Sequence, residues 1–199
     1  HSVVRMDYVK AMQRLIGYLN DCGRHHIVCF GLNPNSSSDR IKESCFAAAE
    51  ASQGSMDPYA HIFYNRANIK ECFKQFLPHA SLYDAMICAN DIVAISALKM
   101  LKSSGIKVPD DIFLAGFGES ILSDKVTPSL TTISLDHEKL GHQAVLLYSY
   151  LCRQDMPITA SVRVESTLIV RKSTDNIPYR PGITYFTPAD PSGNIDFYK

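Results

Sequence analysis

Apolar residues recur along the chain in two alternating patterns, one with helical spacing and one of short unbroken runs. Residues 7–21 have the helical pattern, since Met12 and Leu15 fall on one face of a helix. The segment ends before Gly23, a natural C-terminal helix cap. The run HIVCFGL that follows is typical of a strand buried on both faces. A helix followed by a buried strand is therefore predicted.

The same alternation continues through most of the chain. Helices are predicted over residues 39–52, 68–77 and 90–105 and from Asp136 onward, and strands at residues 61–64 and in DAMICA, IFLAGF, LTTISL and VRVESTLIV. Regular alternation of this kind predicts an α/β domain with a largely parallel sheet, helices on both faces and right-handed crossovers. Residues 175–199 show neither period and contain several prolines, which predicts an irregular tail.

Polar or glycine-containing stretches follow several of the predicted strands. Ligands of parallel α/β sheets bind beyond the carboxyl ends of the strands, so these stretches mark the edge where a ligand is expected. They are residues 33–42, Tyr64 with Asn65, Asn90 with Asp91, and residues 116–120.

Composition narrows the class of protein. The 199 residues are 46% hydrophobic and can bury a substantial core. Twenty Lys+Arg balance 20 Asp+Glu, so these residues have no net positive field that would hold DNA strongly. The chain has no run of about 18 apolar residues, and its opening HSVVRMDYVK lacks the apolar core of a signal peptide. A cytoplasmic protein with no membrane partner is the simplest expectation.

Catalytic and metal-binding signatures do not occur. The six cysteines are irregularly spaced without a C-x-x-C pair, which favours buried reduced thiols over a zinc or redox site. Their even number would also permit disulfides in a secreted protein. Neither G-x-S-x-G, G-x-x-x-x-G-K nor H-E-x-x-H is present. We therefore expect a binding domain, without enzymatic activity, cofactor or metal.

Three segments in a fixed order carry a family resemblance: YDAMICANDIVAISALKMLKSSGIKVPDDIFLAGFGES, TPSLTTISLDHEKLG and VESTLIVRKST. Together they resemble the LacI/GalR family of bacterial repressors, whose sensing domain shares the type I fold of periplasmic sugar-binding proteins. The resemblance covers about residues 7–174, and the tail lies outside it.

The resemblance implies a chain that starts in the middle of such a protein. Residues 24–135 and 161–174 resemble the C-terminal, effector-binding subdomain. The segments 1–23 and 136–160 would supply helices of the N-terminal sensing subdomain, which is otherwise missing. Their apolar faces would lack most of their cover, and a fragment of this kind would be prone to association.

The function implied is effector sensing and dimerisation. Such a domain binds a small sugar or related metabolite, forms a homodimer, and controls operator DNA binding by a helix-turn-helix headpiece absent from this chain. The alternative is a periplasmic-type solute-binding protein of a transport system, which shares the same fold. Residues upstream of His1 would discriminate, because one class carries a basic helix-turn-helix there and the other an export signal.

Candidate ligand contacts follow residue by residue from the family pattern. Asn90, in CAND, matches a position that often contacts ligand, although a helix N-cap would explain it equally. Tyr64 stands where the family often places a stacking aromatic ring, and ordinary packing is its other reading. The family has a ligand-gripping arginine four residues before an aromatic. Counting back from Phe46 gives Lys42, and the nearest arginine is Arg40.

Two residues apart on a helix, Arg40 and Lys42 cannot both face the cleft. Ser38, in the preceding turn, is a further candidate. In AGFGES the family aspartate that accepts ligand hydrogen bonds is replaced by Gly118, so either Glu119 substitutes for it or the ligand is held differently. His137, at the crossing between subdomains, is the last candidate, though a lone histidine is more often a surface or packing residue.

Overall fold

The large sheet of this protein has six strands among the residues that the computed structural model describes, which are 2–54, 57–153 and 159–175. In spatial order they are β3 (Ile62–Tyr64), β2 (Ile27–Leu32), β4 (Ala85–Cys88), β5 (Phe113–Phe117), β6 (Thr131–Ser134) and β8 (Thr167–Ile169). Neighbouring strands are parallel from β3 to β6, and only β8 runs antiparallel to its neighbour. The predicted α/β class with a largely parallel sheet is confirmed.

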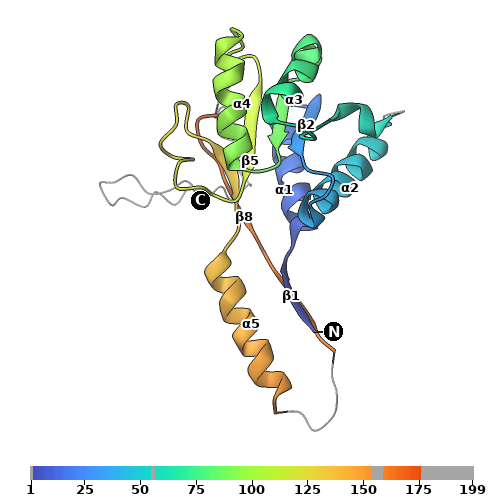
Figure 1. Cartoon of the computed structure of the whole chain (residues 1–199), viewed down its shortest axis with the longest axis vertical. Coiled ribbons are helices and arrows are strands. Elements are labelled where there is room, and N and C mark those ends of the chain that lie inside the picture. Colours follow the sequence, from blue (N-terminus) through green and yellow to red (C-terminus); the bar gives the residue numbers. More distant parts are fainter. Residues whose placement is uncertain (1, 55–56, 154–158, 176–199) are drawn as a thin grey trace.

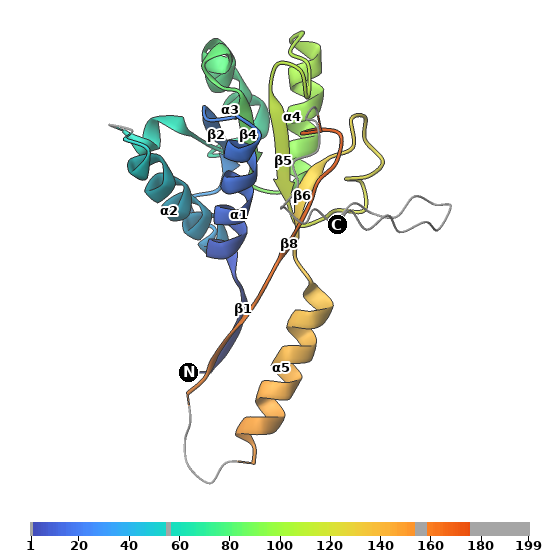
Figure 2. The same cartoon turned by 180° about the vertical axis from the view of Figure 1, so that it is seen from behind.

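Strands β2, β4 and β5 are apolar and buried at every position. This burial follows from helices on both faces of the sheet (Figures 1 and 2), as expected for parallel sheets. Helices α1 (Tyr8–Asp21) and α2 (Ser37–Ser52) cover one face, and α3 (Ile69–Phe76) and α4 (Asp91–Ser103) cover the other. Short 3₁₀ helices, η1 (Pro58–His61) and η2 (Leu77–Leu82), lead into β3 and β4.

Helix α1 corrects one expectation. We expected residues 1–23 to belong to a separate subdomain, with the apolar face of their helix largely uncovered. Instead Met12, Leu15 and Leu19 are fully buried in the same core cluster as Ile87 of β4. Gly23 ends α1 and begins a short connection to β2, so the helix folds back onto its own sheet. The helix belongs to the large α/β body.

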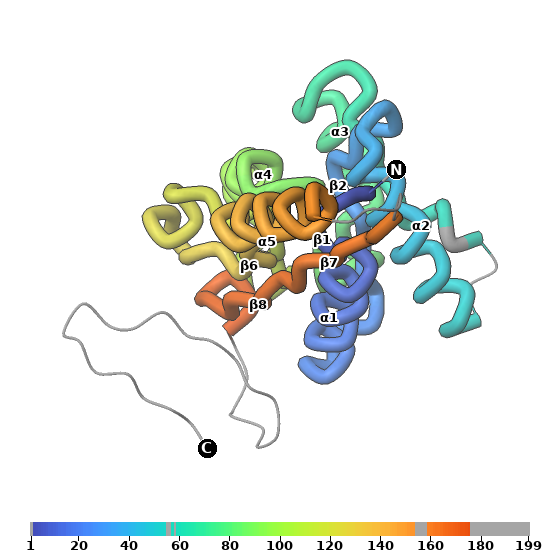
Figure 3. Tube along the Cα trace, turned by 90° about the horizontal axis from the view of Figure 1, so that it is seen from below, coloured from blue at the N-terminus to red at the C-terminus, as the bar shows by residue number. Residues whose placement is uncertain are grey.

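Helix α5 (His137–Leu151) has the opposite surroundings: none of its side chains is buried. It extends away from the large sheet beside a two-stranded parallel ribbon of β1 (Val3–Met6) and β7 (Ser161–Val164), as Figures 1 and 3 show. Its exposed apolar side chains include Val145, at 63%, and Tyr148, at 70%. The expected lack of cover therefore holds for α5. We call α5, β1 and β7 the arm.

The segment VRVESTLIV, expected as one strand, forms parts of two. Strand β7 pairs with β1 in the arm, and β8 pairs with β6 in the large sheet. The chain changes sheets at Glu165 and Ser166, where Arg14 of α1 hydrogen-bonds to the carbonyl oxygen of Ser166. Alternating apolar residues predict a strand but not the strand with which it pairs. The change of sheet between β7 and β8 was therefore not predictable from the periodicity. Of the predicted tail, residues 176–199 lie outside the described residues.

Candidate functional site

A cavity of about 460 Å³ lies at the carboxyl ends of the parallel strands. Its lining residues are Tyr8, Gly31, Asn33, Ser36, Ser38, Asp39, Lys42, Asn65, Ala89, Asn90, Val93, Phe117, Gly118 and Leu135. Asn33, Asn65, Ala89 and Gly118 directly follow β2, β3, β4 and β5, as the rule for parallel sheets predicts. We call it the strand-end cavity.

Two helices begin at the strand-end cavity. Ser36 caps α2, its Oγ accepting from the backbone N–H of Asp39 at 3.3 Å. Asn90 caps α4, its Oδ1 accepting from the N–H of Val93 at 3.0 Å. Because helix N-termini carry partial positive charge, both ends make the cavity favourable for electron-rich ligand groups.

A buried ion pair of Lys42 and Asp39 is part of the cavity lining. The Lys42 Nζ donates to Asp39 Oδ1 at 2.8 Å and to the Ala89 carbonyl oxygen at 2.6 Å, and it lies 4.9 Å from the centre of the Phe117 ring. The second Asp39 oxygen accepts from the backbone N–H of Asn33 at 3.0 Å. The positive charge of Lys42 is thus balanced inside the protein, which lets both side chains remain buried.

Hydroxyl groups line another side of the cavity. Ser36 Oγ and Ser38 Oγ are 3.0 Å apart. Burial, reinforced by the charge of Asp39, raises the pKa of the Tyr8 hydroxyl, and a hydrogen bond with Ser38 lowers it in part. Tyr8 therefore remains a neutral hydrogen-bonding group. Val93, Phe117 and Leu135 add apolar surface to the lining, so the cavity suits a small ligand that has both polar and apolar surface.

Three predicted residues meet here: Ser38, Lys42 and Asn90 all line the cavity. Arg40 does not, since its guanidinium donates to the Pro34 carbonyl oxygen at 3.2 Å on the exposed side of α2. Only one of the two neighbouring cations faces the cavity, as helix geometry requires. The residue that does so is Lys42.

Tyr64 lies beside a different hollow, of about 290 Å³, between β3 and α3. Its hydroxyl donates to Glu43 Oε1 at 2.6 Å, and the Arg66 guanidinium lies 5.2 Å from the centre of its ring. Burial and the neighbouring Glu43 raise the pKa of Tyr64 well above its ordinary value. The ring therefore does not line the strand-end cavity in this arrangement.

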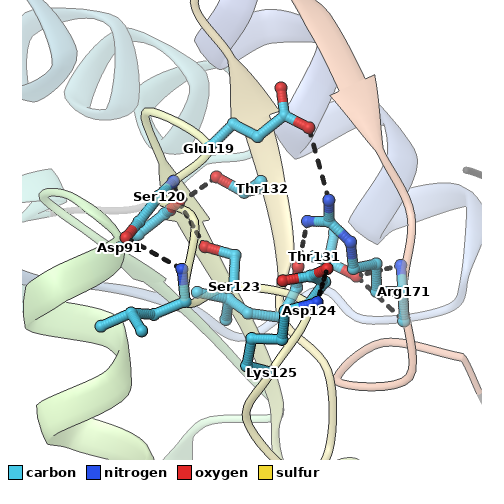
Figure 4. Close-up of polar contacts among 11 residues, drawn as sticks. Asp91, Glu119, Ser120, Ser123, Asp124, Lys125, Thr131, Thr132 and Arg171 are labelled. Carbon is cyan, nitrogen blue, oxygen red and sulfur yellow. Dashed lines mark hydrogen bonds and ion pairs between the residues drawn. The ribbon is translucent and has the colours of Figure 1, made fainter.

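Glu119 is not among the residues that line the cavity, and its side chain points toward Arg171 (Figure 4). Its carboxylate lies 3.4 Å from Arg171 Nη2, which ties it to the end of the described chain. The acceptor lost at Gly118 is therefore not replaced from the next position. His137 is exposed at the start of α5 and is absent from the lining, which Leu135 joins instead.

Several residues that line the strand-end cavity were not among the predicted ligand contacts. Asn33, Ser36, Asp39, Asn65 and Phe117 stand in the stretches that the strand-end rule marked, so the rule itself was their signal. Tyr8 and Leu135 lie where the chain passes between the large sheet and the arm. No local pattern indicated them.

Asp91 fixes the loop beside the cavity (Figure 4). It is 2% exposed, and its two oxygens accept from Thr132 Oγ1 at 2.6 Å, Ser123 Oγ at 2.7 Å and the Ser120 N–H at 2.6 Å. Three donors satisfy one buried carboxylate, so the loop after β5 is held to the first turn of α4.

Metal-binding clusters and membrane-spanning helices are absent from the described residues. Within residues 2–54, 57–153 and 159–175, no group of three or more His, Cys, Asp or Glu side chains could hold a metal ion. In the same residues, no helix combines the length and apolar character that a membrane span requires. None of the six cysteines, all of which lie in the described residues, forms a disulfide.

A mostly parallel sheet, covered on both faces and carrying a polar cavity at its strand ends, is the arrangement in which α/β domains bind ligands. Residues 16–174 match the family model described as periplasmic binding protein-like domain. The chain belongs to this family.

Curated relatives are transcription regulators. The HTH-type transcriptional repressor PurR of Haemophilus influenzae (strain PittEE) is 29% identical over 167 residues, which are 80% of this chain and 49% of the relative. The HTH-type transcriptional regulator GalR of Streptococcus thermophilus is 34% identical over 182 residues, 87% of this chain and 55% of the relative. The chain therefore spans about half the length of the curated relatives it matches, and its resemblance to LacI/GalR effector-binding domains is confirmed.

Solved structures show the same fold. A transcriptional regulator CelR–cellobiose complex superposes with a TM-score of 0.76 at 20% identity, covering 86% of this chain and 54% of that one. A LacI family transcriptional regulator from Silicibacter pomeroyi gives a TM-score of 0.76 at 21% identity, covering 88% and 65%.

Proposed function

We propose that this chain is the effector-sensing domain of a LacI/GalR-type transcriptional repressor and that the strand-end cavity binds a small sugar or related metabolite. The observation that carries the proposal is the meeting of Ser38, Lys42 and Asn90 around one cavity beyond the parallel strands. Family membership, the repressor relatives and the name of a cellobiose complex among the structural neighbours support it.

The proposed mechanism is allosteric. A ligand in the cavity contacts the α/β body and the segments that lead into the arm, and so favours one arrangement of the two. Operator DNA is bound by a helix-turn-helix headpiece supplied outside these 199 residues. The protein acts in the cytoplasm as a sensor, without enzymatic activity. The transport-protein alternative is disfavoured because the relatives are regulators.

We place the homodimer contact on apolar side chains near Asp91. Ile92, at 59% exposed, follows Asp91 in α4, while Ile121, at 86%, and Leu122, at 47%, follow Ser120. Since the Ser120 N–H bonds to Asp91, the two segments that carry these side chains lie close together. Sedimentation of Ile121→Glu should show a lower dimer fraction than the unchanged chain. An unchanged dimer fraction would place the contact elsewhere.

Ligand screening tests the function. The native chain is examined by thermal unfolding against sugars, sugar phosphates and nucleobases, because a ligand that binds only the folded state raises the midpoint in a concentration-dependent way. A saturable rise should be lost in Asn90→Ala and kept in Asn68→Ala, which removes the same kind of cap from α3. A midpoint unmoved by the whole panel would refute the sugar assignment.

A further inference from the structure

Hydrogen bonds to the backbone determine which atom of an asparagine side chain in the cavity remains available to a ligand. Asn90 Oδ1 accepts from the Val93 N–H at 3.0 Å, and a peptide N–H can only donate. The atom bonded to it is therefore the amide oxygen, and the Nδ2 group, with two N–H donors, is the free end. Within the described part of the chain, no hydrogen bond occupies that Nδ2 group.

Asn33 repeats the arrangement on the neighbouring strand. Its Oδ1 accepts from the Asn35 N–H at 3.0 Å, which again leaves the Nδ2 donors for a ligand. The Lys42 ammonium adds one more donor, since two of its three N–H bonds go to Asp39 and Ala89. Strands β2 and β4 are adjacent, so the donors after them line one cavity.

The strongest acceptors beside these donors already accept hydrogen bonds within the protein. Both oxygens of Asp39 already accept, from Lys42 and from the Asn33 N–H, and the Ala89 carbonyl accepts from Lys42. Gly118 contributes no side chain, and Glu119 pairs with Arg171. Among the described lining residues, no carboxylate oxygen is left without a partner. The hydroxyls and the Asn65 amide add acceptor capacity beside the donors.

We infer that the effector carries an anionic, acceptor-only group, a carboxylate or a phosphate ester, seated against the Asn33 and Asn90 amides and the Lys42 ammonium. This inference rests on the proposed function, because it specifies the ligand of the same cavity. The N-termini of α2 and α4 both open there and favour negative charge. A neutral sugar fits less well, since its hydroxyls also need acceptors.

Matched ligand pairs test the inference by titration calorimetry on the 199-residue chain. The pairs are glucose with gluconate and glucose 6-phosphate, galactose with galacturonate, and ribose with ribose 5-phosphate. The acidic member of at least one pair should bind at least about tenfold more tightly than its neutral partner, as expected for charge-assisted hydrogen bonds. Which acidic member binds distinguishes a carboxylate from a phosphate ester.

The variant Asn90→Asp sharpens the test. Aspartate keeps the oxygen that caps α4 but replaces the free N–H donors by a second, negatively charged acceptor. The acidic ligand should bind about tenfold to a hundredfold more weakly. Asn68→Asp makes the same change at the cap of α3, where Asn68 Oδ1 accepts from the Glu71 N–H at 2.9 Å outside the strand-end cavity, and should leave binding unchanged.

The outcomes separate this inference from the proposed function. Tighter binding of the neutral member in every pair, with affinity unaffected or improved by Asn90→Asp, overturns the anionic ligand and leaves a sugar sensor standing. Absence of binding by every compound, with the chain folded, overturns the sugar assignment and this inference together.

Discussion

A side-chain carbon on Gly116 would lie 2.2 Å from Oδ1 of Asp91, closer than any real contact permits. The packing of β5 against α4 depends on this relationship, because β5 must approach the first turn of α4 without a side chain between them. Asp91 then reaches the loop after β5 and accepts its three hydrogen bonds. Glycine at this position is thus a requirement of packing.

Gly116→Ala should lower the free energy of unfolding by about 2–4 kcal/mol, because the added methyl must displace a hydrogen-bonded buried carboxylate. Urea denaturation measures the change. Gly17→Ala is the matched control, since a carbon there meets nothing within 4 Å. In α1 it should be neutral or stabilising by up to about 1 kcal/mol. Equal losses in both variants would contradict the packing argument.

Lys42→Met should cost about 3–5 kcal/mol, because it leaves the Asp39 carboxylate buried without its cation. Side-chain exposure in this pair is only 6% and 11%. The pair Lys74 and Glu71 has the same spacing and the same 2.8 Å separation at 71% and 50% exposure. Lys74→Met should therefore cost no more than about 1 kcal/mol.

The double variant Lys42→Met with Asp39→Asn supplies the decisive comparison. It should recover part of the loss of the single lysine variant, since the uncompensated charge is then removed. Denaturation curves for the four chains give the coupling energy. A double variant that loses the sum of the two single effects would argue that the pair is not coupled.

Glu50→Gln should stabilise the protein increasingly as pH rises. Burial raises the pKa of the Glu50 carboxyl, and the charges of His61 and His26 reverse part of the rise. A raised carboxyl pKa means that the stability from Glu50 is complete below about pH 4.5, its unfolded value, and is lost as pH rises through the folded value. Glutamine does not ionise and keeps that stability.

The Glu50 carboxylate has a histidine as its neighbour. His61 Nε2 lies 3.8 Å from its carboxylate, and the Tyr83 ring packs edge-on against His61. Because the pKa of Glu50 is raised, the stabilising effect of glutamine should be larger at high pH than at low pH. Denaturation at about pH 4 and pH 8 measures the difference. Glu138→Gln, at an exposed position of α5, should show no comparable pH dependence.

Thiol reactivity should follow burial. Burial raises the pKa of the Cys29 and Cys88 thiols well above their ordinary value, so very little reactive thiolate forms. Cys152 is exposed. Ellman's reagent should modify Cys152 first in the native protein and reach Cys29 and Cys88 only on unfolding. Cys152→Ser should remove the fast phase, and its persistence would show that another thiol is accessible.

The architecture was predictable because buried strands and amphipathic helices produce periodic patterns of apolar residues in the sequence. These patterns also locate the ends of the strands. That logic located Asn90 and the stretch from Asn33 to Lys42. Direction of individual side chains was less predictable, since Tyr64 and Glu119 turn toward partners distant in sequence, Glu43 and Arg171. Periodicity also predicted α1 as a helix without indicating which sheet it covers.

The route of the chain between body and arm has a mechanical consequence. In the described residues it crosses three times: after β1, after β6, and between β7 and β8. Tyr8 stands just after the first crossing strand and Leu135 just after the second, and both line the strand-end cavity. A molecule in the cavity therefore touches two of the three connections between the body and the arm. Any rotation of the arm relative to the body changes the shape of the cavity that the molecule occupies.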